Sequence, residues 1–209
     1  MCGIIGYTGR DNAKDIMLDA LELLEYRGYD SAGIALLGED GTQIMKRAGR
    51  VNDLRNLCEE KKPVGNCGIG HTRWATHGGV CDENAHPHRF GKITLIHNGI
   101  IENYRELTEK YELEGKLVSE TDSEVVAAVL EHFYSGDPYS AIRRTVLKIK
   151  GTFALAIMFD DQPGKIFAVR NVSPIVAAAT KDGAILSSDV AAIVPFTTDY
   201  FVMPEFHVV

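Results

Sequence analysis

The sequence predicts a single α+β domain whose strands are mainly antiparallel. Apolar residues recur at helical spacing near the N-terminus and in the middle of the chain, whereas the last third consists of short apolar runs separated by turns. No internal repeat, low-complexity tract or linker interrupts the 209 residues, a length that one large domain can fill. Together these observations favour one domain of mixed helices and antiparallel strands over residues 1–209.

The N-terminal part should open with a short buried strand, followed by a helix that Asn12 caps. In this helix Ile16, Met17 and Ala20 begin an apolar face at helical spacing. Gly38–Gly41 marks a turn between two later strands. The elements predicted before residue 92 are strands at 3–8, 31–37, 43–46 and 67–72, helices at 12–26 and 52–60, and a polar loop from Arg73 to Gly91.

The rest of the chain is predicted to contain three helices and then most of the remaining strands. Val125, Val126 and Val129 give the middle helix its packing face. The apolar, strand-like end at Phe206–Val209 suggests that the polypeptide is part of a longer one. The predicted elements are strands at 92–97, 152–159, 165–169, 175–179, 184–187 and 200–202, helices at 104–111, 123–134 and 138–149, and a helical turn at 189–193.

Charge and composition exclude several classes of partner. The formal net charge of -7 argues against nucleic acid or an anionic membrane, and no apolar stretch approaches the ~20 residues that a membrane span needs. The N-terminus runs directly into charged residues, so we expect no signal peptide. Cys2, Cys58, Cys67 and Cys81 form no CxxC pair, which favours a reducing compartment and a cytoplasmic protein.

Cys2 is the first candidate catalytic residue. Initiator methionine is usually removed when the next residue is small, and removal of Met1 leaves Cys2 with a thiol and a free α-amine. The α-amine has an unperturbed pKa of about 7.7–8.0, so it can take the thiol proton near neutral pH. One residue then carries both nucleophile and base. The alternative is a cysteine that merely begins an apolar strand.

The segment Gly70–Gly78 is rich in functional side chains. The planar guanidinium of Arg73 is suited to holding a carboxylate through two hydrogen bonds, and Thr76 offers a further donor. Alternatively, the segment is a surface loop in which Arg73 pairs with a nearby acid and Trp74 covers the edge of the core.

Two further motifs each allow a structural and a functional interpretation. Asn98-Gly99 usually indicates a tight turn, but the Asn98 amide and the Gly99 N–H are also suited to holding one developing negative oxygen, as an oxyanion hole. Asp122 precedes a helix, where Thr121, Asp122 or Ser123 is expected as the N-cap. An aspartate at such a corner can also bind a substrate ammonium.

The histidines invite a metal-site hypothesis, which the sequence supports weakly. His86 and His88 form an H-x-H pair, with His71 and His77 upstream. No cysteine or acidic ligand stands beside them at the spacing of a zinc site. We therefore expect neither a catalytic metal nor another cofactor, and a metal-dependent hydrolase is a distant alternative.

Taken together, five ordered motifs resemble those of the class II glutamine amidotransferases over essentially the whole chain. The N-terminal Cys-Gly-Ile-x-Gly is shared across that family. Among its branches, the motifs look most like those of the enzymes that transfer ammonia to fructose 6-phosphate, and less like the purine-pathway and asparagine-forming branches, which differ around Arg27-Gly28. The motifs that carry the resemblance are Leu24–Gly33, His71–Gly78, Asn84–His88, His97–Asn103 and Ser119–Glu124.

The resemblance implies an N-terminal-nucleophile αββα four-layer sandwich with two mainly antiparallel sheets. It implies that Cys2 attacks the side-chain amide of L-glutamine, releasing ammonia and then glutamate. Where residues match, the resemblance implies further roles. Asn98 and Gly99 hold the oxyanion, Arg73 and Thr76 bind the α-carboxylate of glutamine, and Asp122 binds its α-ammonium. Trp74 lies on a mobile loop, and His77 and His86 order the pocket.

The sequence also departs from the family pattern. Asn171-Val172 stands before Ser173-Pro174 where the family usually has a small residue and glycine, which leaves the local loop conformation open. The fructose-6-phosphate isomerase domains that follow in the longer enzymes have no counterpart in this chain, and the resemblance allows a homo-oligomer. Two alternatives remain: a class II subunit that supplies ammonia to another acceptor, and a non-catalytic glutamine-sensing module.

Overall fold

The computed structural model describes residues 2–75 and 78–209. Within them the strands form one seven-stranded and one four-stranded sheet, and every strand pairing in both is antiparallel. In order across it, the larger sheet contains β11 (Phe201–Val202), β9 (Val176–Ala179), β10 (Gly183–Ser187), β1 (Gly3–Gly9), β4 (Cys67–Arg73), β2 (Ser31–Gly38) and β3 (Gly41–Ala48). The smaller contains β5 (His88–Phe90), β6 (Ile93–Ile101), β7 (Gly151–Phe159) and β8 (Phe167–Asn171).

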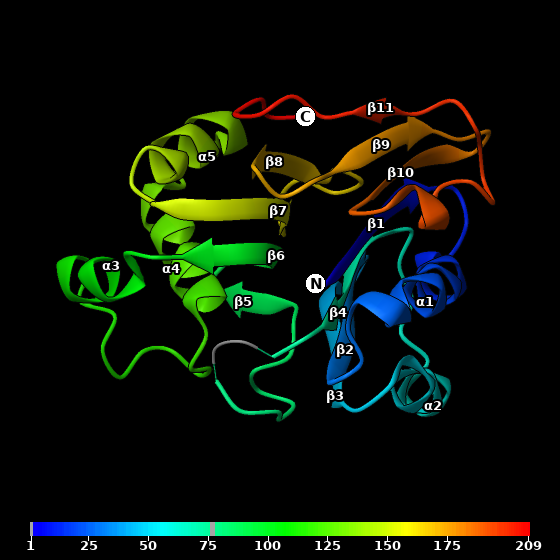
Figure 1. The fold of residues 1–209 in the computed structure, drawn as a ribbon, viewed down its shortest axis with the longest axis horizontal. Coiled ribbons are helices and arrows are strands. Elements are labelled where there is room, and N and C mark those ends of the chain that lie inside the picture. The colour runs from blue at the N-terminus through cyan, green and yellow to red at the C-terminus, as the bar shows by residue number, and fades with distance from the viewer. Residues whose placement is uncertain (1, 76–77) are drawn as a thin grey trace.

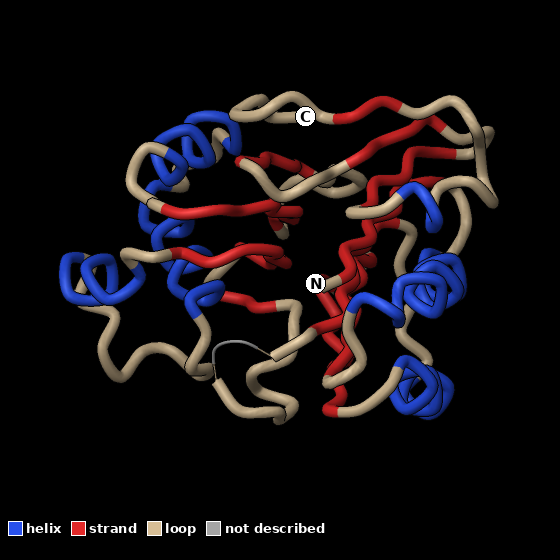
Figure 2. The backbone as a smooth tube through the Cα atoms, viewed as in Figure 1, coloured by secondary structure: helices blue, strands red, loops and turns tan. Residues whose placement is uncertain are grey.

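Helices cover the outer face of each sheet (Figure 1). The larger sheet carries α1 (Ala13–Leu24) and α2 (Val51–Lys61), and the smaller carries α4 (Asp122–Phe133), with α3 (Tyr104–Lys110) and α5 (Pro138–Val146) packed on α4 or beside it. Short 3₁₀ turns lie at Glu25–Arg27 and Val190–Ala192. Figure 2 shows the order helix, sheet, sheet, helix, which confirms the predicted four-layer αββα sandwich.

Three apolar clusters hold the layers together. One lies between α1, α2 and the larger sheet, and contains Leu21 and Ile34. A second lies between the helices on the other side and the smaller sheet, around Val129 and Phe153. The third fills the space between the two sheets, with Ile69 and Ile96 from opposite sides. The sandwich therefore has a separate core at each of its layer boundaries.

Local predictions were mostly confirmed. The Asn12 side chain accepts a hydrogen bond from the Lys14 N–H (3.3 Å), and Thr121 caps α4 by accepting from the Glu124 N–H (3.4 Å). Cys58 and Cys67 are buried, and all four cysteines are free. No helix among the described residues is long and apolar enough to cross a membrane.

Among the boundaries that differ from the predictions, two matter for the site. The predicted loop at 73–91 contains β5, and Arg73 is the last residue of β4 rather than the first of the loop. The predicted strand at 92–97 continues to Ile101, so Asn98-Gly99 lies inside β6 and is not a turn. Pairing with β7 along its whole length outweighs the turn preference of the Asn-Gly dipeptide.

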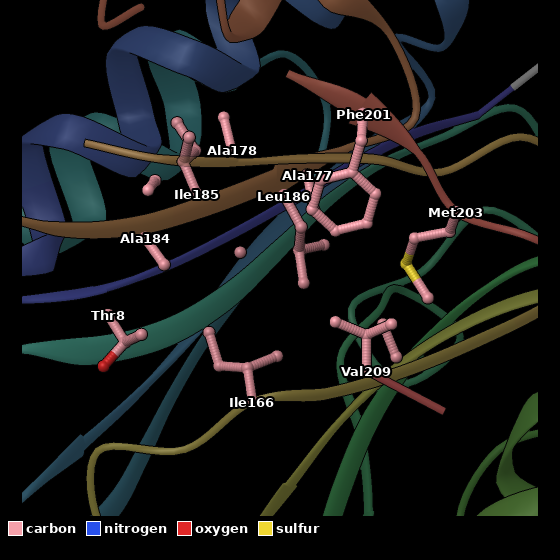
Figure 3. Close-up of a pocket in the computed structure, with 13 residues that line it drawn as sticks. Thr8, Ile166, Ala177, Ala178, Ala184, Ile185, Leu186, Phe201, Met203 and Val209 are labelled. Atoms are coloured by element: carbon pink, nitrogen blue, oxygen red, sulfur yellow. The ribbon is translucent and has the colours of Figure 1, made fainter. Parts of the chain in front are cut away.

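The C-terminal segment 201–209 joins the open edges of the two sheets (Figure 1). β11 pairs with β9 of the larger sheet, and Val209 then exchanges two backbone hydrogen bonds with Ala168 of β8 (2.8 and 3.0 Å). Beneath this segment lies an apolar cavity of about 200 Å³. Figure 3 shows Met203 and Val209 facing Ile166 and Leu186 across it.

Candidate active site

The Cys2 thiol lies at the seam between the two sheets, directly before β1. The backbone N–H of Trp74 donates a hydrogen bond to the Cys2 sulfur (3.2 Å), which itself lies 3.6 Å from the Trp74 carbonyl oxygen. Burial raises the pKa of the Cys2 thiol, and the hydrogen bond from Trp74 opposes this increase only in part. The thiol is therefore mainly protonated at neutral pH and needs a base before it can attack.

The amide of Asn98 is held in one orientation from both ends. Its Nδ2 donates to the Cys2 carbonyl oxygen (3.0 Å), and its Oδ1 lies 2.9 Å from His71 Nε2. His71 Nε2 also lies 3.1 Å from the carbonyl oxygen of His97. Because both of its neighbours are acceptors, Nε2 must carry the proton of a neutral ring. Burial lowers the pKa of His71 to about 3, which keeps the ring neutral.

Gly99 follows Asn98 in β6 and has a backbone conformation that only glycine takes easily. Its φ is +135°, and a Cβ atom there would lie 2.0 Å from the Thr152 carbonyl oxygen on β7. Close approach of the two strands thus requires glycine at this position. Asn98 and Gly99 both line a cavity with Cys2, so the structure brings the three predicted catalytic residues together.

The two charged candidates for substrate recognition share one small cavity with Cys2. It measures about 30 Å³, and Arg73 and Asp122 lie in its wall together with Gly99. Asp122 occupies the first turn of α4, and its Oδ2 accepts a hydrogen bond from the Ile101 N–H (2.7 Å). A carboxylate has about four acceptor positions, so Asp122 keeps capacity for an ammonium group.

Arg73 reaches this cavity from the end of β4. Its guanidinium donates to the carbonyl oxygens of Gly79 (3.1 Å) and Gly78 (3.4 Å), which fold the following loop back over it. The side chain is buried, and burial lowers its pKa. A guanidinium group nevertheless keeps its charge in proteins. Thr76 and His77, which the sequence predicts beside Arg73, lie outside the described residues.

Buried histidines pack against the same cavity. His86, predicted to order the pocket, stacks on His71 with ring centroids 4.1 Å apart, and its Nε2 lies 3.4 Å from the Ser123 hydroxyl. That hydroxyl is also 2.9 Å from His97 Nδ1 and 3.3 Å from Asp122 Oδ1. Burial keeps the pKa of His86 and His97 below the ordinary histidine value. The cluster therefore supplies neutral hydrogen-bonding groups rather than charge.

A second, larger cavity also has Cys2 in its wall. Its volume is about 240 Å³, and its walls are Cys2, Arg27, Trp74, Asn98, Gly99, Ile100, Thr152, Ser173 and Pro174. Arg27 donates from Nε to the Cys2 carbonyl oxygen (3.3 Å) and forms an ion pair with Asp189. Trp74 is 46% exposed at the rim, where a loop side chain has room to move.

The sequence motifs predicted no role in the site for His71, His97, Ser123 or Arg27. The signal for His71 was present, because in a strand residues i and i+2 share a face, and His71 stands two residues before Arg73. Ser123 and His97 have no such signal, since their contact joins segments 26 residues apart. Among the described residues, no group of three or more potential ligands is arranged to hold a metal ion.

Two stacked antiparallel sheets between helical layers, with a cysteine thiol at the head of a central strand, define the N-terminal-nucleophile class of fold. Comparison with known proteins shows to which family within this class the chain belongs. Residues 72–195 match the family described as the glutamine amidotransferase domain. The chain belongs to this family, in its class II branch.

Its curated relatives include enzymes named glutamine–fructose-6-phosphate aminotransferase (isomerizing). Identity is 45% to the one from Symbiobacterium thermophilum and 47% to the one from Aquifex aeolicus, over 98% of this chain in each case. Identity to the Thermus thermophilus enzyme is 48% over 94% of the chain. The chain spans only about a third of the length of these relatives, 33% to 35%.

Solved structures give the same fold. The glutamine phosphoribosylpyrophosphate amidotransferase of B. subtilis, in complex with ADP and GMP, aligns with a TM-score of 0.82 at 26% identity, covering 96% of this chain and 44% of that one. A class II glutamine aminotransferase domain protein from Silicibacter pomeroyi aligns with a TM-score of 0.65 at 13% identity, covering 100% and 93%. The second likeness concerns the fold alone.

Proposed function

We propose that this chain hydrolyses L-glutamine to L-glutamate and ammonia, with Cys2 as the nucleophile. The observation that carries the proposal is the position of the Asn98 amide, which reaches the Cys2 backbone (3.0 Å) and lines one cavity with the thiol and Gly99. A nucleophile beside preorganised amide donors is the arrangement that acyl transfer requires. Removal of one such donor typically costs roughly 100- to 1,000-fold in rate.

The reaction needs a base, and we propose the α-amine of Cys2 itself. Removal of Met1, which lies outside the described residues, frees that amine. The amine takes the thiol proton, sulfur bonds to the amide carbon of glutamine, and the C–N bond breaks as the nitrogen receives the proton and leaves as ammonia. Water then adds to the thioester carbon and the C–S bond breaks, which releases glutamate and restores the Cys2 thiol.

Opposite charges in one cavity support free glutamine as the substrate. A free amino acid carries an α-carboxylate and an α-ammonium, whereas a glutamine inside a protein carries neither. Arg73 and Asp122 line the same space as Cys2 and match these two charges. We propose Thr76 as a further carboxylate contact, with Trp74 on the closing loop, and His77 and His86 ordering the pocket.

The ammonia acceptor is proposed from the relatives. Those named glutamine–fructose-6-phosphate aminotransferase are about three times as long as the part that matches this chain. We propose that residues 1–209 correspond to their glutaminase domain, and that the ammonia serves amino sugar synthesis when fructose-6-phosphate isomerase domains are present. The chain's free cysteines support a cytoplasmic location, and a homo-oligomer is compatible with this role.

Two measurements on one sample test this proposal. Intact mass reports whether Met1 is present, and a coupled assay measures glutamate released from glutamine. We expect a processed chain with glutaminase activity that Cys2→Ser abolishes while the melting temperature stays the same. A processed chain that binds glutamine without releasing glutamate would contradict the catalytic role and favour a sensing module.

A further inference from the structure

The turn after β8 contains a valine in a backbone conformation that favours glycine. The N–H of Ser173 donates to the Asn171 carbonyl oxygen (2.8 Å), which closes a three-residue turn around Val172, whose φ is +68°. These features are those of the γ-turn with positive φ, which is rare and strained. A β-branched residue at positive φ is an outlier on steric grounds. Val172 is 62% exposed, so burial of its side chain does not offset the strain.

Two side chains hold the backbone on both sides of Val172. Glu205, from the C-terminal segment, accepts a hydrogen bond from the Val172 N–H on Oε1 (3.1 Å). Arg170 donates from Nη1 to the carbonyl oxygens of Val172 (3.1 Å) and Ser173 (3.3 Å). The surroundings thus supply the contacts that a strained backbone needs in order to persist.

Arg170 also ties the turn to the C-terminal segment. Its Nε donates to the Met203 carbonyl oxygen (2.6 Å), and its Nη1 lies 3.5 Å from Glu205 Oε1. The Phe206 N–H donates to the Arg170 carbonyl oxygen (2.9 Å). At this turn the chain crosses from the smaller to the larger sheet, and at 203–206 it returns in the opposite direction. Arg170 and Glu205 therefore join the two segments that connect the sheets.

The two residues directly after Val172 line the same cavity as Cys2. Ser173 and Pro174 form part of the wall of the 240 Å³ cavity that also contains Cys2. Arg73 and Asp122, which match the charges of glutamine, line the other, smaller cavity. The turn therefore borders a cavity that contains Cys2 but is lined by neither Arg73 nor Asp122.

We propose that Arg170 and Glu205 are positioning residues that hold the strained turn at Val172, and with it the Ser173–Pro174 wall of the Cys2 cavity. The rate of turnover at Cys2 then depends on the placement of the C-terminal segment 201–209, whereas glutamine binding does not. This inference rests on the proposed glutaminase activity of Cys2.

Kinetics of four variants of the full chain test the proposal. Glu205→Ala removes the acceptor of the Val172 N–H, and we expect kcat to fall by about fivefold, the effect of one hydrogen bond, with KM within about twofold of wild type. Glu205→Gln keeps an acceptor oxygen and should retain most of kcat. Adding Val172→Gly to Glu205→Ala should restore kcat, because glycine adopts positive φ without support.

Glu106→Ala is the matched control, since Glu106 forms an exposed ion pair with Lys150 (3.7 Å), and it should leave both constants unchanged. Melting temperatures give an independent readout: Val172→Gly should raise the melting temperature more in the Glu205→Ala background than in wild type. The inference is overturned, while the proposed function stands, if kcat is equal in wild type and Glu205→Ala. The same holds if Glu205→Ala loses kcat and adding Val172→Gly does not restore it. A wild-type chain without glutaminase activity overturns the proposed function and this inference with it.

Discussion

His71 Nε2 donates a hydrogen bond to Asn98 Oδ1 across 2.9 Å, and this contact decides which way the Asn98 amide faces. With its oxygen toward the histidine, the amide turns its nitrogen toward Cys2, where it meets the backbone carbonyl at 3.0 Å. A strand of the larger sheet thereby orients a proposed oxyanion donor on a strand of the smaller sheet. The orientation is set before any substrate binds, which is the preorganisation that lowers an activation barrier.

Replacement of His71 should therefore affect the chemical step more than binding. We expect His71→Phe to lower kcat for glutamine by roughly 10- to 100-fold, less than full loss of an oxyanion donor, because the amide is present but free to rotate. KM should stay within about threefold, and His71→Gln, which keeps a side-chain N–H, should recover part of kcat. A wild-type kcat in a folded His71→Phe variant contradicts this role.

The role of Asp122 can be tested with the substrate as well as the protein. Asp122→Asn keeps an acceptor for the Ile101 N–H but removes the charge, so we expect kcat/KM for glutamine to fall by about 100-fold at constant melting temperature. Glutaramic acid lacks the α-amine, and its kcat/KM should be the same in wild type and Asp122→Asn. The exposed Asp40→Asn serves as control. If the variant discriminated equally against both substrates, Asp122 would not be the ammonium contact.

The buried histidines predict loss of stability in mild acid. The pKa values of His71, His86, His88 and His97 are all lowered by burial, that of His71 to about 3. Below about pH 6.5 the unfolded chain binds protons at these histidines, whereas the folded chain does not bind them until the lowered pKa values are reached. The stability that the neutral histidines allow is therefore fully present above about pH 6.5 and falls as the pH decreases. Each histidine contributes up to about 1.4 kcal/mol per pH unit.

Urea unfolding at pH 7, 6 and 5 measures this dependence. Replacing a buried histidine by glutamine, as in His88→Gln, should reduce the slope of the unfolding free energy against pH by about one proton. Replacement of the exposed Asn52 by glutamine changes no titratable group and should leave the slope as it is. Identical slopes for wild type and His88→Gln would show that His88 takes up protons equally in the folded and the unfolded chain, which would contradict this account.

Gly99 should tolerate no side chain. A Cβ atom at Gly99 meets the Thr152 carbonyl oxygen at 2.0 Å, and its φ of +135° disfavours any L-residue. We expect Gly99→Ala to separate β6 from β7, to cost about 2–4 kcal/mol of stability and to abolish detectable turnover. Gly79→Ala is the control, since a Cβ at Gly79 has nothing within 4 Å and its φ is not positive. Unchanged thermal stability in Gly99→Ala would contradict this account.

The sequence predicted site residues best where a residue type has few structural roles that would explain it at its position. Cys2 at the N-terminus and Arg73 after an apolar strand were both identified from the sequence, and both lie at the site. Helices with a clear apolar period, such as α1 and α4, were placed to within a few residues. In these cases the local pattern and the fold favour the same structure.

Other features depend on contacts that no local pattern encodes. β5 covers only His88–Phe90, which is too short to show an alternation, so the sequence pattern predicts a loop there. Asn98-Gly99 has the dipeptide of a tight turn, and only its pairing with β7 makes it part of a strand. The hydrogen bond between Glu205 and Val172 joins residues 33 positions apart, and the γ-turn that it holds has no sequence signature beyond the missing glycine.

The place of β1 in the larger sheet has a consequence for the order in which the protein is made. Among the described strands, β1 leaves the ribosome first, yet one of its two neighbours is β10, whose register with it sets Ile5 opposite Ser187. The smaller sheet, which carries Asn98, and α4, which carries Asp122, are synthesised in between. While these residues are synthesised, the nascent chain therefore exposes the Cys2 thiol without its proposed oxyanion donors and substrate contacts, and β1 gains its second neighbour only when residues 183–187 have emerged.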